Sequence, residues 1–344
     1  MRYVMGRVDI GNNKRMIRNV ALELTEACNY KCVMCDYWRL TAPNSMTVES
    51  AKAFLDLFPG DTLKSALITG GEPLLNRHWR EIAALLPPGA RKSICTNGSP
   101  ILVKNRDIGE YFDRVTVSID GARRETFASI RGYDHLHGIF DALETLKSLY
   151  PNIIVYLKMT IQRQNFREVV ELMDVASRLA FVDGVGFGVL DFSESAFAFD
   201  REEFERDPYV KATLLTDSEI EEFEEFVFDF ESRYEREIAS GFVYEGDLRR
   251  YLNRFKSLRG HPCAPQPRSC IIPNVSAVLR ADGKILGCYF LPSEITIDEV
   301  IASGVERLEE LACRHTSLGN PTCARCDQLL FRNSPFELPK SAAL

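Results

Sequence analysis

Three cysteines stand close together near the start of the sequence. Cys28, Cys32 and Cys35 follow the apolar run 20–24 with the spacing C-x3-C-x2-C. Three thiolates on so short a loop can surround one inorganic centre. Iron–sulfur clusters are held by cysteine thiolates, usually four, so three would leave one iron open to an exogenous ligand. The spacing also leaves open a zinc site completed by a distant residue, and buried thiols without any metal.

A glycine-rich motif follows the next predicted strand. The sequence Thr69-Gly70-Gly71-Glu72-Pro73 places two glycines directly before a carboxylate. Glycines let the backbone approach a ligand closely, and a carboxylate accepts hydrogen bonds from an ammonium group. Both motifs therefore have the residue types of a ligand site, and each follows a predicted strand.

The ordered pair of motifs resembles the radical S-adenosylmethionine (radical SAM) superfamily. The resemblance implies that Cys28, Cys32 and Cys35 ligate a [4Fe-4S] cluster whose open iron binds the amino and carboxylate groups of SAM. It also implies reductive cleavage of SAM to methionine and a 5′-deoxyadenosyl radical, which abstracts hydrogen from a bound substrate. The SAM-binding positions that it implies are Met34, Gly70, Gly71, Glu72, Pro73, Asn97, Ser118, Asp120 and Arg131.

Some of these positions have structural alternatives. Residues 96–98 and Asp120-Gly121 are ordinary turn sequences, and Ser118 at a strand end can cap the following helix. Arg131 resembles an arginine that related enzymes use on the SAM carboxylate, but without that resemblance a surface ion pair is the favoured interpretation.

A second group of cysteines lies toward the C-terminal end. Cys270 and Cys288 flank Gly283 with the spacing C-x12-G-x4-C, and Cys323 and Cys326 form a C-x2-C pair. Four such cysteines suit a tetrahedral zinc site or a cubane cluster. Their order resembles the twitch domain, a shortened SPASM domain appended to many radical SAM enzymes. This resemblance implies one auxiliary [4Fe-4S] cluster on the four cysteines.

Other side chains have less specific patterns. Cys263 is an alternative to Cys270 as a ligand and a candidate catalytic hydrogen donor, although an unpaired structural cysteine is the simpler interpretation. Cys95 falls in a predicted strand and is expected in the core. No short motif identifies a catalytic base, and the candidates near predicted strand ends are Arg280, Tyr289 and Lys158.

Alternating strands and helices must position these groups. Short β-branched runs alternate with amphipathic segments over residues 20–190, which is typical of a parallel sheet with helices outside it. Six βα units fall short of an eightfold barrel, so we expect an α/β partial (β/α)6 TIM-like barrel with its site at the carboxyl ends of the strands. Asn165 and Glu168 stand at capping-box spacing before one helix. The predicted strands are 20–24, 66–69, 92–96, 114–119, 153–161 and 185–190, and the predicted helices include 47–58 and 166–179.

The later part of the chain differs in composition. Residues 193–262 are acidic and helical, which favours a bridging segment with a solvated acidic face. A hairpin is expected over 277–289, with Asp282-Gly283 at its turn. The predicted organisation is a radical SAM barrel over 1–192, the bridging segment, and a small iron–sulfur twitch domain over 263–344. The apolar stripe predicted for the acidic segment comprises Ile220, Phe223, Phe226, Phe230, Tyr234 and Ile238.

Composition limits the remaining possibilities. The 344 residues are 45% hydrophobic and 26% charged, which is ordinary for a globular protein. A net charge of −7 gives no electrostatic footprint for nucleic acid or anionic membranes. The sequence lacks an apolar run of about 18 residues and a signal peptide, so a cytoplasmic location is expected. In that reducing compartment, ten cysteines favour metal ligands over disulfides.

The resemblance extends to a class of reaction. The order of elements in this sequence is similar to that of aminocyclitol dehydrogenases. Related enzymes epimerise aminoglycosides or decarboxylate sugar nucleoside acids. We therefore expect dehydrogenation of a sugar, cyclitol or nucleoside in antibiotic biosynthesis, with an electron donor such as flavodoxin or ferredoxin. A radical epimerase or decarboxylase is the first alternative.

Two further classes were weighed against this expectation. A peptide-modifying radical SAM maturase is the second alternative, although such enzymes usually need a leader-binding module, which the 27 residues before Cys28 do not supply. A GTP cyclase of molybdopterin synthesis has a three-cysteine second site and a C-terminal Gly-Gly. This sequence instead has four cysteines and ends in Ser-Ala-Ala-Leu.

Overall fold

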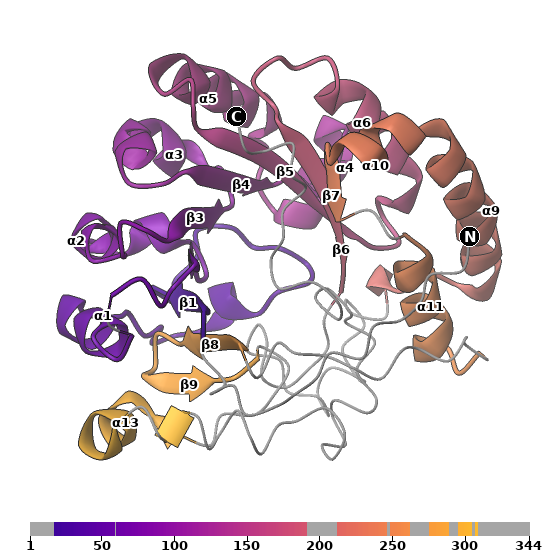
Figure 1. The fold of residues 1–344 in the computed structure, drawn as a ribbon. Coiled ribbons are helices and arrows are strands. Elements are labelled where there is room, and N and C mark those ends of the chain that lie inside the picture. Colours follow the sequence, from indigo (N-terminus) through magenta and orange to yellow (C-terminus); the bar gives the residue numbers. More distant parts are fainter. Residues whose placement is uncertain are drawn as a thin grey trace, which may run out of the picture.

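A single curved sheet organises the protein (Figure 1). The computed structural model describes residues 17–58, 60–190, 212–245, 248–261, 275–288, 295–304 and 307–308. In this part of the chain the sheet has ten strands in the order β10-β9-β8-β1-β2-β3-β4-β5-β6-β7. The strands are β1 (Asn19–Glu23), β2 (Ser65–Thr69), β3 (Arg91–Thr96), β4 (Arg114–Ser118), β5 (Ile154–Ile161), β6 (Gly184–Val189), β7 (Val243–Glu245), β8 (Ser276–Leu279), β9 (Lys284–Leu286) and β10 (Ile295–Thr296).

The expected α/β partial barrel is confirmed. All six predicted strands are present, and each observed end lies within one residue of its prediction. They pair in parallel from β1 to β6, as expected when a helix or loop crosses back between successive strands. The helices α1, α2, α3 and α5 lie on the outer side of the curve (Figure 1).

The helices are mostly shorter than the sequence pattern suggests. The helix predicted over 47–58 is α1, which begins after the N-cap Thr47 and ends at Leu55. The helix predicted over 166–179 begins as a 3-10 turn, η4 (Phe166–Glu168), and continues as α6 (Val169–Ala176). None of the helices in the described ranges is long and apolar enough to cross a membrane. The α-helices are α1 (Val48–Leu55), α2 (Trp79–Ala84), α3 (Pro100–Lys104), α4 (Arg124–Arg131), α5 (Leu136–Leu149), α6, α9 (Asp217–Arg233), α10 (Glu235–Ser240), α11 (Leu248–Leu258) and α13 (Ile297–Ser303), and the other 3-10 turns are η1 (Tyr37–Arg39), η2 (Pro73–Leu75) and η3 (Arg106–Glu110).

Two short strands extend the parallel sheet beyond the six predicted ones. At one edge β7 pairs in parallel with β6. At the other edge β8 pairs in parallel with β1, with Val20 opposite Ala277. The predicted hairpin is confirmed, because β8 and β9 are antiparallel and Gly283 adopts a φ of 83° at the turn. The hairpin therefore continues the barrel sheet, while the domain boundaries stay a prediction.

The acidic helix α9 packs on the barrel. Its buried residues are Ile220, Phe223, Val227 and Phe230, so most of the predicted stripe is correct, although Val227 replaces Phe226 as a fully buried position. Phe223 meets Phe166 of η4 edge-on, with ring centroids 6.0 Å apart.

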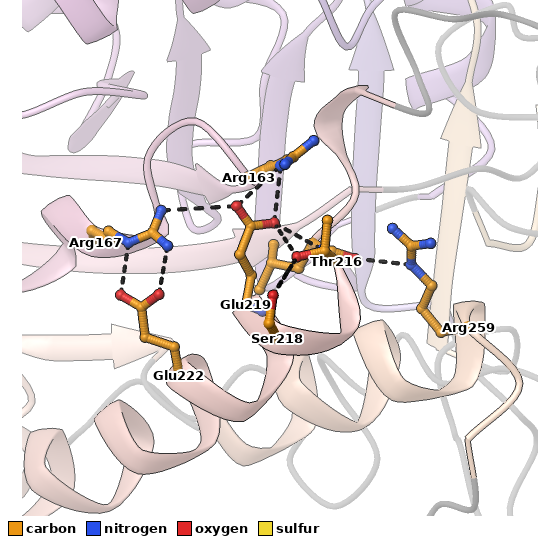
Figure 2. Close-up of polar contacts among 8 residues, drawn as sticks. Arg163, Arg167, Thr216, Ser218, Glu219, Glu222 and Arg259 are labelled. Atoms are coloured by element: carbon orange, nitrogen blue, oxygen red, sulfur yellow. Dashed lines mark hydrogen bonds and ion pairs between the residues drawn. The ribbon is translucent and has the colours of Figure 1, made fainter.

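The predicted solvated acidic face is correct at Glu222, which is exposed, and wrong at Glu219, which is only 13% exposed. At the start of α9 both carboxylates pair with arginines (Figure 2). Glu219 forms a capping box with Thr216, and its carboxylate lies 2.9 Å from Nε of Arg163. Glu222 accepts a 2.6 Å hydrogen bond from Nε of Arg167. Arg163 lies in the loop after β5 and Arg167 lies in η4, so these carboxylates attach α9 to the barrel.

Candidate cofactor site

The cysteine loop leaves the carboxyl end of β1 and is held by backbone contacts. Cys32 is buried, whereas Cys28 and Cys35 are half-buried. The N–H of Val33 donates to the carbonyl of Ile130 at 2.9 Å, and the indole of Trp38 donates to the carbonyl of Cys32 at 3.2 Å. The loop is therefore fixed on one side by the end of α4 and on the other by η1.

The three thiols share one environment. Burial raises the pKa of Cys28 to about 11, and the neighbouring Cys32 adds to this shift. Burial also raises the pKa of Cys35, with further contributions from both other thiols. The raised pKa values favour the protonated thiols. Bound iron would reverse this preference, because a coordinating thiol is deprotonated outright.

The spacing of the thiols bears on the choice of metal. In the described ranges, no three His, Cys, Asp or Glu side chains are close enough together to hold one metal ion. Thiolates of a cubane cluster each bind a different iron, whereas a zinc ion draws its ligands onto one centre. By their chemistry, three cysteine thiols on one loop fit an iron–sulfur cluster, and the choice of this cluster over zinc stays a prediction.

The glycine motif lies directly against the cysteine loop. A Cβ on Gly71 would come within 2.4 Å of the carbonyl oxygen of Ala27. The N–H of Gly71 donates to the carbonyl of Thr25 at 2.7 Å, and that of Glu72 donates to the carbonyl of Ala27 at 2.8 Å. Gly71 thus permits two loops to meet, and its predicted contact with SAM stays a prediction.

Glu72 is a fully buried carboxylate at this edge of the sheet, with an exposed fraction of 0%. It accepts hydrogen bonds from Oγ1 of Thr96 at 2.9 Å and from the N–H of Asn97 at 2.8 Å. Burial nevertheless raises its pKa to about 7. A nearby cation stabilises the ionised form of such a buried carboxylate, and the ammonium group of a ligand would provide that cation.

Asn97 connects Glu72 to the cysteine loop. Its Nδ2 donates to Oδ1 of Asn29 at 2.8 Å and lies 3.8 Å from Sγ of Cys28. Thr96 and Asn29 were not among the predicted site residues. Thr96 stood next to Asn97 in the same turn sequence, but no pattern in the sequence marked Asn29 apart from its place between two cysteines.

Arg131 reaches the same loop from the end of α4. Its Nη1 lies 3.1 Å from Oδ2 of Asp120 and 3.4 Å from Sγ of Cys32. Its Nη2 donates to the carbonyl of Ser118 at 3.3 Å. The exposed fractions of the Arg131 and Asp120 side chains are 8% and 1%, so the surface ion pair left open by the sequence is wrong.

Asp120 is itself fixed by the neighbouring strand. Its Oδ1 accepts from the N–H of Thr160 at 2.7 Å. Asn165 donates to the carbonyls of Asp120 and Thr160, both at 2.9 Å, and Glu168 accepts from the N–H of Ala122 at 2.9 Å. The capping box predicted for Asn165 and Glu168 is wrong, because these side chains satisfy backbone groups of the β4 loop instead.

Another buried ionic group joins β1 to β8. Nε of Arg280 lies 3.2 Å from Glu23, and its Nη2 lies 3.7 Å from Glu26. The hydroxyl of Tyr37 also donates to Glu23. Burial opposes the charge of Arg280, but both carboxylates help to keep its pKa above the ordinary value. Arg280 is therefore a fixed cation and is not suited to the proposed role of base.

The strand face turned away from the helices carries further predicted residues. Ile94 is fully buried in the main core, whereas the next residue, Cys95, is half-buried. Lys158 is opposite Gly186 in the β5–β6 register, and a Cβ on Gly188 would lie 3.4 Å from Cε of Lys158. Cys95 is thus in the predicted strand but on the face opposite to Ile94.

The remaining predicted residues are only partly described. Met34 packs against Leu190, which directly follows β6. Cys288 follows β9 and is half-buried. The predicted residues that lie outside the described residues are Cys263, Cys270, Tyr289, Cys323 and Cys326.

Comparison with known proteins places this geometry in a family. The model of the Radical SAM superfamily matches residues 22–176, which include the cysteine loop and the glycine motif. This part of the chain is therefore similar to radical SAM domains, and the resemblance expected from the two motifs is confirmed over residues 22–176.

Curated relatives match this domain over part of their length. The chain is 28% identical over 170 residues to a probable GTP 3′,8-cyclase of Thermococcus kodakarensis, covering 48% of this chain and 54% of that protein. It is 33% identical over 167 residues to an Fe-coproporphyrin III synthase of Methanosarcina barkeri, covering 45% and 40%. The chain thus spans about half or less of these relatives. The similarity to aminocyclitol enzymes stays a prediction.

Solved structures show the same fold over more of the chain. anSMEcpe with bound AdoMet and Cp18Cys peptide has a TM-score of 0.61 at 17% identity, covering 92% of this chain and 88% of that chain. SuiB of Streptococcus suis bound to the precursor peptide SuiA has a TM-score of 0.60 at 14% identity, covering 92% and 71%. At these identities the likeness concerns the fold of the radical SAM domain and the segments after it.

Proposed function

We propose that the chain is a radical SAM enzyme that dehydrogenates a sugar, cyclitol or nucleoside. One observation supports SAM cleavage most directly: the three-cysteine loop and the buried Glu72 meet at the carboxyl edge of a radical SAM domain. A [4Fe-4S] cluster on Cys28, Cys32 and Cys35, together with SAM, supplies a 5′-deoxyadenosyl radical when both are bound.

The protein's own residues bind and orient SAM in this proposal. Glu72 accepts from the SAM ammonium group, which gives this buried carboxylate a directly hydrogen-bonded cation. Asn97 keeps Glu72 and the cysteine loop in register through its contacts with both. Met34, which is half-buried against Leu190, presents apolar surface for the adenine ring.

The inner face of the sheet supports a polar substrate. Glu23 lies on β1 and pairs with Arg280, which directly follows β8. Cys95 on β3 and Lys158 on β5 are half-buried positions next to fully buried core residues. Carboxylate, guanidinium and ammonium groups recognise hydroxyl and amino groups through directed hydrogen bonds. An aminocyclitol, sugar or nucleoside has such groups around a compact ring.

A dehydrogenation needs an acceptor for a second electron. Abstraction of one hydrogen atom leaves a substrate radical, and loss of one electron and one proton from that radical completes the oxidation. The proposed acceptor is the predicted auxiliary cluster on Cys270, Cys288, Cys323 and Cys326. Pairing of β8 with β1 supports this role, because Cys288 follows a hairpin that is part of the barrel sheet.

The test begins with metal content. Anaerobically reconstituted protein is analysed for iron, sulfide and zinc, and then for 5′-deoxyadenosine after addition of dithionite and SAM. We expect about eight irons per chain and deoxyadenosine formation. Cys32→Ala should abolish deoxyadenosine formation and retain about four irons. Formation of deoxyadenosine by Cys32→Ala would overturn the assignment of the first cluster.

Substrate class is tested separately. Aminocyclitols, sugar nucleotides, nucleosides, GTP and short peptides are supplied, and products are measured by mass spectrometry. A product two mass units lighter than a cyclitol, sugar or nucleoside is expected. Product from GTP alone or from peptides alone would overturn this part of the proposal. About four irons plus one zinc would remove the electron acceptor and favour a redox-neutral reaction such as epimerisation.

A further inference from the structure

Arg131 makes a direct polar contact with one cysteine of the loop. Its Nη1 donates to Sγ of Cys32 at 3.4 Å, although 99 positions separate the two residues in the sequence. Cys32 Sγ in turn lies 3.9 Å from the backbone carbonyl of Arg131. When the thiol loses its proton to bind iron, only the contact from the guanidinium to sulfur can persist.

The charge balance around this contact is fixed by burial. The exposed fractions of Arg131 and Asp120 are 8% and 1%, and the guanidinium lies 3.1 Å from the carboxylate. Within the described residues, Oδ2 of Asp120 and Nε of Arg131 have no hydrogen-bond partner. Arg131 and Asp120 therefore do not satisfy all of each other's hydrogen-bonding atoms, and incomplete satisfaction of buried charges costs free energy. A negatively charged neighbour on the Cys32 side would offset part of that cost.

We propose that Arg131 is a positioning residue that raises the reduction potential of the cluster bound at Cys32, and that Asp120 limits this increase. The inference rests on the proposed cluster ligands and adds to them a function for two residues that the resemblance implied only for SAM. Hydrogen bonds to sulfur and net local charge are two of the properties that set cluster potentials.

The direction of each effect follows from charge. Reduction adds one electron, so the reduced cluster is more negative than the oxidised cluster. A fixed cation hydrogen-bonded to a ligand sulfur stabilises the reduced form more. Asp120 places a negative charge beside that cation and reduces its influence. Removing Arg131 should therefore lower the potential, whereas removing the charge of Asp120 should raise it.

The other charges near the pair come from separate elements. Glu72 follows β2 and is close enough to affect the Arg131 charge, and Lys158 on β5 is close enough to affect Asp120. Tyr30 lies under the guanidinium, with Cζ of Arg131 5.7 Å from its ring centroid. These groups remain unchanged in the variants below, so a difference between the variants reports the Arg131–Asp120 pair.

The experiment is a redox titration of the reconstituted full chain, without SAM, monitored by electron paramagnetic resonance. The signal lost in Cys28→Ala identifies the relevant cluster. For Arg131→Gln we expect the equilibrium constant for one-electron reduction to fall about tenfold, which corresponds to about 59 mV. Arg131→Lys should shift less, and Asp120→Asn should shift in the opposite direction. Iron content of each variant is measured in parallel.

A matched control lies on the same helix. Arg124 is exposed and paired with Asp134, so Arg124→Gln removes the same charge from α4 without touching Cys32. Its potential should equal that of the wild type. An equal shift in Arg124→Gln, no shift in Arg131→Gln with iron retained, or shifts of one sign for Arg131→Gln and Asp120→Asn would overturn the inference.

Two outcomes need separate interpretation. If Arg131→Gln fails to retain iron, Asp120→Asn decides, because it keeps the arginine: an unchanged or lower potential then overturns the inference. If wild-type protein binds no cluster, the proposed function fails as well. A role confined to the SAM carboxylate predicts no shift in this experiment, because SAM is absent.

Discussion

Gly71 and Ala27 are packed so closely that a single methyl group on Gly71 would come within 2.4 Å of the Ala27 carbonyl oxygen. The two residues belong to different βα loops, and each loop contains one of the motifs proposed to hold the cofactor. This contact sets the spacing between the Gly-Gly-Glu-Pro motif and the cysteines before any ligand binds.

Gly71→Ala should therefore disturb the cluster loop. Because the added carbon meets backbone atoms, relief requires a backbone shift, and overpacking of this kind costs about 1–3 kcal/mol. We expect a lower midpoint in urea unfolding and reduced iron incorporation. Gly188→Ala is the control, since its added carbon meets only a side-chain atom at 3.4 Å. Equal effects of both substitutions would contradict the prediction.

Glu72 should give the site a pH dependence. Its carboxyl has a pKa of about 7 in the folded chain and an ordinary value of 4.5. The folded state thus binds more protons between these values, so the free energy of unfolding should fall as pH rises from about 4.5 to 7. Glu72→Gln should lack this part of the pH dependence, which urea unfolding at several pH values would measure.

The same carboxyl should affect SAM binding in the opposite sense. Its ionised form pairs with an ammonium group, so SAM affinity should increase as pH rises through about 7 in the wild type. Loss of one charged hydrogen bond costs about 2 kcal/mol, so Glu72→Gln should bind SAM ~30-fold more weakly. Titration calorimetry of the reconstituted protein tests both points, and parallel pH profiles of wild type and variant would contradict them.

The start of α9 offers a test of how the acidic segment is attached. The Glu219 side chain is 13% exposed, caps the helix and pairs with Arg163, whereas Glu222 is exposed and pairs with Arg167. Glu219→Ala should destabilise the protein by about 1–2 kcal/mol, because it removes a cap as well as an ion pair. Glu222→Ala should cost less than about 1 kcal/mol. Denaturant unfolding with equal losses would argue against this distinction.

Arg280 should be essential for the junction between β1 and β8. Its removal leaves Glu23 buried without its cation, and breaking such a buried pair costs about 3–5 kcal/mol. Arg280→Met should therefore unfold at lower temperature than wild type. Because Glu23 would need to be protonated, the loss should grow as pH rises. The double variant Glu23→Gln/Arg280→Met should regain stability in thermal unfolding, and failure to do so would refute this account.

Sequence patterns were most informative where local chemistry determines structure. The short apolar run 66–68 in β2 is visible in the sequence, and the first six strands follow from such runs. β7 has three residues and β8 has four, which is too short for a periodic signal. Their place in the sheet depends on partners that are distant in the sequence.

The candidate site shows the same division. The cysteines and Glu72 were identified from motifs, whereas the partners of Arg131 and Glu23 were not. Arg131 ends an amphipathic helix, where an arginine is usually exposed, and only the fold brings it to Cys32. Glu23 and Arg280 are 257 positions apart, so no local pattern links them. Asn165 and Glu168 had correct capping-box spacing. Their side chains instead form hydrogen bonds with backbone groups of the loop after β4, namely the Asp120 carbonyl and the Ala122 N–H.

The parallel pairing of β1 with β8 also has a consequence for biosynthesis. β1 is flanked on one side by β2, but Asn19 pairs on its other side with Ser276, which is made much later. This edge of β1, directly before the cysteine loop, therefore lacks its β8 partner until Ser276 has been made. Open strand edges promote association with other chains. Iron delivery and protection by chaperones would thus have to act on an unfinished barrel, or wait until β8 closes that edge.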